Sequence, residues 1–273
     1  NFEPCLRLLL EFVSTPYFTK ESVDKEQGII GQEIGMSRDN PDHRIFELLM
    51  ENMYPNHPIR TPILGSRESI GRITPETLTA CHRAFYRPDN MMLCVVGDVD
   101  PAQVCAIARE MIPEKSPDTV TRTDGWAETM EPICAFAEES MEVAMPMFQL
   151  GFKCEDGGSG AAAIRQEVIG DLACEALFGE SSSLYMQLYE KGIIDGSFGG
   201  GFETVDGVAL VTVSGDSEAP EMVKDAILEE AKRLLRDGIP QEDFLRMKRS
   251  ALGRRIRELD SFDSTCFRLC AYH

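Results

Sequence analysis

The sequence lacks a hydrophobic run that could cross a membrane, and no N-terminal segment has secretory character. Its longest apolar stretches, 91-MMLCVVG-97 and 143-VAMPMFQLGF-152, are only as long as strands, whereas a spanning helix needs roughly 20 apolar residues. We therefore expect no membrane partner. With 43% hydrophobic residues over 273 positions, the chain has enough apolar side chains for one large or two ordinary domains.

Basic residues are scarce. The 27 lysines and arginines face 46 aspartates and glutamates, which gives a net charge of −19. Such a charge repels a phosphate backbone, because binding it requires cations that replace the condensed counterions. We therefore expect no nucleic-acid partner.

Paired cysteine motifs are also absent. The nine cysteines include no Cys-x-x-Cys, and several lie within apolar patterns, as is typical of reduced thiols in a cytoplasmic protein. Cys266 and Cys270 fall on one face of a predicted helix. The only nearby histidine is His273, so a metal site there is weakly supported and we interpret both cysteines as core residues.

Capping residues and prolines divide the first part of the chain into helices. Thr19 caps a predicted helix that ends at about Ser37, a second helix covers about 43–52, and Thr74-Pro75 opens a third that ends near Phe85. The apolar segment 91–100 predicts a strand, which Asp100-Pro101 connects to a further helix.

The second part of the chain predicts strands followed by long helices. A hairpin is expected around Asp206-Gly207. Its strands are predicted at 197–205 and 207–215, other strands at 133–139 and 143–152, and helices at 161–178, 180–192, 220–236 and 241–260.

An internal similarity supports two related domains. The segment 94-CVVGDVDPAQVCAIAREM-111 resembles 212-TVSGDSEAPEMVKDAILEEA-231 in its order of strand, Gly-Asp, turn, proline and helix. We predict an α+β fold in which each domain is a mainly antiparallel sheet covered by helices. The expected domains are 1–115 and 131–273, joined by a linker at 116–130.

Two acidic residues stand out in the segment 24-DKEQGIIGQEIGM-36. Glu26 and Glu33 are seven residues apart, so on a helix they share one stripe, together with Val23, Ile29 and Ile30. A buried carboxylate needs a partner, a proton or a metal ion. The alternative is a solvated rim of the helix, and the spacing by itself favours that alternative.

Several further segments occur in a characteristic order and cover nearly the whole chain. They are 33-EIGMSRDNPDHR-44, 54-YPNHP-58, 65-GSRESIGRIT-74, 85-FYRPDNMMLCVVGDVD-100, 178-FGESSSLYMQLYEKG-192 and 248-KRSALGRRIRELDS-261. In this order the chain resembles the pitrilysin/insulinase family of zinc metallopeptidases, the inverzincins, in its bacterial processing-peptidase-like branch. The resemblance implies a zinc endopeptidase that hydrolyses peptides in a chamber between two halves.

The resemblance also implies roles for the two glutamates. Glu33 matches the carboxylate that joins two histidines of a His-x-x-Glu-His helix as a zinc ligand, and Glu26 matches a second functional glutamate that positions a ligand or the metal-bound water. The sequence contains no His-x-x-Glu-His. We therefore interpret it as an internal fragment with an incomplete zinc site, truncated in its second domain and inactive alone.

The second domain departs from the family pattern. Active members carry an arginine and a tyrosine that hold the substrate backbone, but here Tyr189 stands at the arginine position and no tyrosine lies near Asp195 in the sequence. A homologous partner chain, in a heterodimer or homodimer, is expected to supply the missing residues. The alternative function is a non-catalytic partner or assembly subunit of the same fold.

Overall fold

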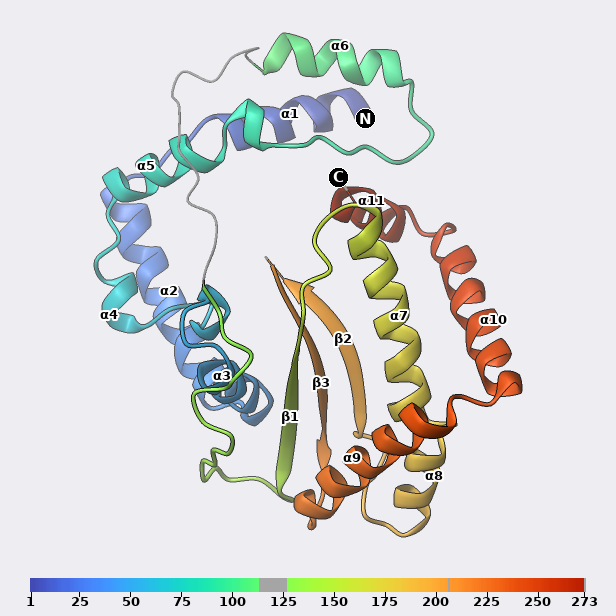
Figure 1. Cartoon of the computed structure of the whole chain (residues 1–273). Helices are drawn as coiled ribbons and strands as arrows, with labels where there is room; N and C mark the ends of the chain where they lie inside the picture. The colour runs from blue at the N-terminus through green and yellow to red at the C-terminus, as the bar shows by residue number, and fades with distance from the viewer. Residues whose placement is uncertain (113–126, 206, 273) are drawn as a thin grey trace. The chain divides into compact units, whose positions relative to one another are not determined.

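The computed structural model describes residues 1–112, 127–205 and 207–272, and Figure 1 shows the arrangement of their helices and strands. The elements in chain order are α1 (Phe2–Ser14), α2 (Lys20–Arg38), α3 (Pro41–Met53), η1 (Pro58–Arg60), α4 (Arg67–Ile70), α5 (Pro75–Phe85), η2 (Pro88–Asn90), α6 (Pro101–Met111), β1 (Met147–Cys154), α7 (Ala161–Phe178), α8 (Ser183–Glu190), β2 (Gly199–Val205), β3 (Val208–Asp216), α9 (Pro220–Asp237), α10 (Gln241–Glu258) and α11 (Phe262–Ala271).

These elements form two compact units. The first contains the described residues of 1–35, 64–112 and 256–272, and the second contains those of 36–63 and 127–255. The predicted linker covers 116–130, and its residues 116–126 lie outside the described part of the chain. The domain division there remains a prediction.

The second unit is built on an antiparallel sheet with the strand order β1-β3-β2. The predicted hairpin is confirmed, since β2 pairs with β3 from Val205 opposite Val208. Because side chains alternate along a strand, central β3 presents Val211 and Val213 to one face and Val208 and Leu210 to the other. An apolar β3 therefore fits a sheet that is covered on both faces.

Helices α7, α8 and α9 cover one face of this sheet (Figure 1). Their buried side chains meet those of the strands in one hydrophobic cluster, in which Val213, Val223 and Ile227 are at most 1% exposed. Burying such side chains stabilises the fold by roughly 1.5–3 kcal/mol each, so this cluster is the main core of the unit.

Gly170 on α7 lies directly against the Phe202 ring of β2, and a β-carbon there would overlap the ring. We expect Gly170→Ala to lower the free energy of unfolding by about 1–3 kcal/mol, because overpacking outweighs the better helix propensity of alanine. Gly253 on α10 has no atom within 4 Å of the corresponding position. The matched control Gly253→Ala should raise the unfolding free energy by about 0.5–1 kcal/mol. Urea denaturation measures both, and equal effects would contradict the assigned contact.

Helix α3 packs on the opposite face, over β1. Asn40 caps its N-terminus by accepting hydrogen bonds from the amides of Asp42 and His43, and Pro41 fits the first turn because its missing N–H would have no helical partner. The predicted helix at 43–52 is thus confirmed, with an earlier start. Met50, Met53 and Tyr54 pack against Val208 and Leu210 of β3.

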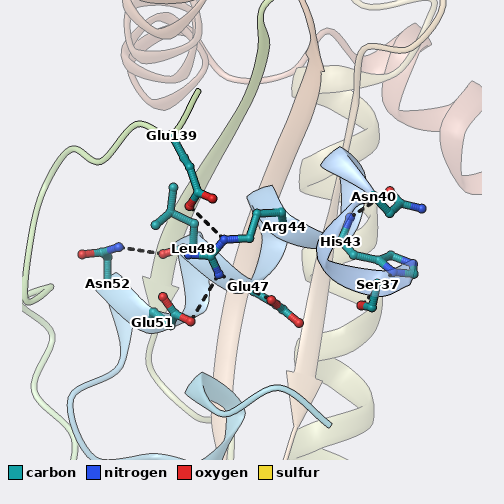
Figure 2. A network of polar contacts seen from close by, with 9 residues as sticks. All are labelled: Ser37, Asn40, His43, Arg44, Glu47, Leu48, Glu51, Asn52 and Glu139. Atoms are coloured by element: carbon teal, nitrogen blue, oxygen red, sulfur yellow. Dashed lines mark hydrogen bonds and ion pairs between the residues drawn. The ribbon is translucent and has the colours of Figure 1, made fainter. Parts of the chain in front are cut away.

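The outer side of α3 carries an ion-pair network (Figure 2). Arg44 Nη1 lies 3.4 Å from carboxylate oxygens of Glu47 and Glu51, and its Nε lies 2.9 Å from Glu139 Oε2. Arg44 therefore connects helix α3 to the segment that precedes β1.

Two predicted strands, 91–100 and 133–139, are wrong, because neither segment belongs to a sheet in the structure. An apolar segment becomes a strand only where a neighbouring strand satisfies its backbone groups. The amides of Ile133 and Cys134 instead donate to the Asn52 carbonyl near the end of α3. The α+β class is confirmed.

In the first unit, helices α1 and α6 pack through Leu6, Leu10 and Ile107. Arg7 connects the same helices, since its guanidinium lies 2.9 Å from both Glu3 and Glu110. No helix among the described residues is both long and apolar enough to cross a membrane.

Candidate functional site

Helix α2 carries the two glutamates singled out in the sequence, and its N-terminus is held by a reciprocal cap. The Ser22 amide donates to Thr19 Oγ1 and the Thr19 amide donates to Ser22 Oγ, each over 3.1 Å. The predicted cap at Thr19 is therefore confirmed, and the helix ends at Arg38, one residue after the predicted end.

The buried stripe of α2 is not the stripe that the sequence suggested. Val23, Gly31 and Ile34 are buried, whereas Ile29 is 40% exposed. Gln27, on the same side as Gly31, donates from Nε2 to the carbonyls of Ile70 and Ile73 over 3.1 and 2.8 Å. Of the apolar residues predicted to share the stripe with the two glutamates, Val23 is buried, but Ile29 is not.

The glycines of α2 explain this orientation. Arg67 of α4 lies across the helix, and its guanidinium nitrogens are 3.5 and 3.4 Å from where β-carbons would lie on Gly31 and Gly35. Two glycines one turn apart leave room for this long side chain. The sequence analysis did not identify Arg67 as a contact of α2, although two glycines one turn apart indicate that another group approaches the helix closely there.

Glu26 and Glu33 lie on the exposed flank of α2. Their positions differ by about 20° around the helix axis, because seven residues nearly complete two turns. Neither carboxylate has a hydrogen bond or ion pair with another residue in the described part of the chain. Both are therefore free to bind a ligand from outside these residues.

Glu33 can supply one ligand to a zinc ion, but the side chains around it do not complete a zinc site. A protein zinc site with three protein ligands uses nitrogen, sulfur or carboxylate oxygen. Among the described residues, no group of three such side chains close enough to share an ion includes Glu26 or Glu33. Glu33 thus supplies one exposed carboxylate that pairs with no cation among the described residues, and a zinc ion there needs further ligands.

In the second unit, Tyr189 of α8 lies on the protein surface, 52% exposed. Its ring stacks on Tyr185 with centroids 5.7 Å apart. Burial raises the pKa of Tyr185, with smaller contributions from the negative charges of nearby groups. Asp195 accepts hydrogen bonds from Ser197, which hold the pKa of its carboxyl below its usual range.

A hollow in the second unit is lined by residues of α7, the start of β2 and α10. Cys174 lies on its wall with Phe178 and Arg254. Burial raises the pKa of Cys174 to about 12. The thiol is therefore protonated at neutral pH, which excludes it as a thiolate nucleophile.

An antiparallel sheet with helices on both faces makes this an α+β protein, and comparisons with known proteins identify its family. The sequence model for "Peptidase M16 inactive domain" matches residues 72–251, and that for "Insulinase (Peptidase family M16)" matches residues 1–67. The chain therefore belongs to the M16, or insulinase, peptidase family, which confirms the resemblance seen in the sequence.

Relatives span more than this chain. "Uncharacterized zinc protease YmfH" of Bacillus subtilis is 38% identical over 96% of the chain, which covers 61% of that protein. A crystal structure of an M16-like peptidase from Alicyclobacillus acidocaldarius matches the whole chain with a TM-score of 0.89 and 28% identity, over 65% of its own length. A protease from Helicobacter pylori shares the fold, with a TM-score of 0.86 at 18% identity.

Proposed function

We propose that this chain is part of a zinc-dependent endopeptidase whose complete form hydrolyses peptides. The observation that carries the proposal is the exposed pair Glu26 and Glu33, which has no partner in the described residues and lies on a helix of an M16 domain. The zinc-protease name of the Bacillus subtilis relative supports the metal. Because the chain covers 61% of that relative, the remaining ligands are assigned to the rest of the protein.

The two glutamates have different roles in this proposal. Glu33 holds the metal through its carboxylate, while Glu26, two turns earlier, positions a ligand or water. When bound, zinc supplies the Lewis acidity that activates water and polarises a scissile carbonyl. Both side chains lie on one flank of a helix held at its N-terminus and by Gln27, so their relative positions are well defined.

The proposed partners are a peptide substrate and a homologous chain in a heterodimer or homodimer, in the cytoplasm. A peptidase in which Tyr189 replaces a backbone-binding arginine needs that contact from elsewhere, which favours a second chain. The alternative function is a non-catalytic partner or assembly subunit of the same fold. The description "inactive domain" of the family model over residues 72–251 is compatible with either function.

Chelation of the complete protein tests the function. We expect peptide hydrolysis to stop with a zinc chelator and to return when Zn²⁺ is restored. Glu26→Gln should retain zinc and lower kcat by roughly 10–100-fold, as removal of outer-shell partners does. Hydrolysis that is insensitive to chelation would refute zinc dependence, and a complete protein that is inactive alone but activates a homologous chain would establish the alternative.

A further inference from the structure

Three cysteines from distant parts of the sequence meet in the first unit. Cys94 follows η2, and Cys266 and Cys270 lie on α11. Their sulfur atoms all lie within 4.8 Å of one another. Cys94 Sγ is 4.0 Å from the Cys266 carbonyl and Cys266 Sγ is 3.8 Å from the Cys94 carbonyl, so the two segments contact each other directly.

The local structure explains how the thiols converge. Cys266 and Cys270 are one helical turn apart, so their side chains share a face of α11. Cys94 comes from an extended segment 172 residues before Cys266. Cys94 and Cys266 are partly buried and Cys270 is exposed, which leaves one side of the cluster open to solvent.

Helix α11 has little apolar packing. It contains no buried residue, and Phe262, Phe267 and Leu269 are each more than half exposed. Apolar burial therefore contributes little to holding α11 in the unit. The interpretation of Cys266 and Cys270 as core residues is wrong, because Cys270 is exposed and Cys266 is only partly buried.

We propose that Cys94, Cys266 and Cys270 bind one Zn²⁺ ion as three thiolate ligands. Tetrahedral zinc with bonds of about 2.3 Å places its sulfur ligands about 3.8 Å apart, so the cluster needs only a small contraction. Thiolates favour zinc over magnesium or calcium. The open side near Cys270 leaves the fourth position for water.

Binding has a defined proton balance. Hydrogen bonding with Cys266, together with partial burial, raises the pKa of Cys94 to about 11. The Cys94 thiol is therefore protonated without the metal, and each thiol that binds Zn²⁺ as a thiolate releases its proton to solvent. The bound ion joins α11 to the segment that contains Cys94, a structural role separate from that of Glu33.

Metal titration of the reduced, metal-free 273-residue chain tests this site. Zn²⁺ is measured by competition with a chromophoric chelator, and Co²⁺ by the absorption of its thiolate bonds. We expect one tightly bound ion with thiolate-to-cobalt absorption, and at least about a 100-fold loss of affinity in Cys94→Ser and in Cys270→Ser. Cys105→Ser, which replaces an exposed thiol in the same unit, and Glu33→Gln should both bind like the parent chain.

A second measurement needs no variant. Zn²⁺ should protect Cys94, Cys266 and Cys270 from alkylation, mapped by mass spectrometry, while exposed Cys5 and Cys81 continue to react. Equal alkylation of the cluster with and without Zn²⁺ would overturn the site. So would unchanged affinity in a folded Cys270→Ser chain, or a disulfide within the cluster together with no metal uptake after reduction. Loss of binding in Glu33→Gln with the thiols still reactive would place the ion on α2 instead.

Discussion

In the complete protein, Glu33→Gln is expected to abolish zinc binding at α2 and to lower kcat/KM for peptide hydrolysis by at least about 1,000-fold, or about 4 kcal/mol of transition-state stabilisation. The amide keeps the size of the side chain but loses the negative charge that a zinc ligand supplies. Zinc content is best measured in a Cys94→Ser background, which removes the proposed thiolate site from the count.

The structure predicts that this variant folds normally. Glu33 is exposed and has no partner in the described residues, so its replacement should change the unfolding free energy by less than about 0.5 kcal/mol. Glu21→Gln is the matched control, because Glu21 is also an exposed acid on α2 but lies in its first turn. The control should retain zinc and activity. Full activity in Glu33→Gln would rule out the assigned ligand.

The second large effect is expected at Lys153 on β1. Its side chain is 6% exposed, and its Nζ lies 3.7 Å from Glu128 Oε2 and 4.6 Å from the centre of the Tyr54 ring. It also donates a hydrogen bond of 2.7 Å to the Thr129 carbonyl. Burial lowers the pKa of Lys153, so these contacts are needed to compensate for the lost hydration of its charge.

We expect Lys153→Met to lower the free energy of unfolding by about 3 kcal/mol, because Glu128 would remain as a buried charge without its cation. Glu128 also accepts hydrogen bonds from the amides of Asn56 and His57, so the loss should loosen the segment after α3. The double variant Lys153→Met with Glu128→Gln should recover part of the loss, since glutamine can still accept from both amides.

Urea denaturation of the chain measures the free energy of unfolding of each variant. Lys248→Met, at an exposed position of α10, is the control and should change stability by less than about 0.5 kcal/mol. Equal losses in the two lysine variants would show that the contacts of Lys153 with Glu128 and Tyr54 contribute nothing. A double variant less stable than Lys153→Met would contradict the charge argument.

Local sequence signals predicted the elements whose ends and periodicity they control. Thr19 supplies a cap that acts within one turn, so α2 begins where the sequence predicted, and β2 and β3 pair as the predicted hairpin, with Gly207 at a φ of 86°. The segments 91–97 and 133–139 have strand-like composition but no partner strand in the described structure. Strand formation depends on a neighbour, which composition does not specify.

By itself, the sequence determined the family, the α+β class and the common azimuth of Glu26 and Glu33, since motif order and helical periodicity are properties of the chain alone. Only the tertiary structure decided which side of α2 is buried, because that depends on Arg67 and on the carbonyls that Gln27 contacts. It likewise brought Cys94 to Cys266 and Cys270, a contact across 172 residues that no local spacing encodes.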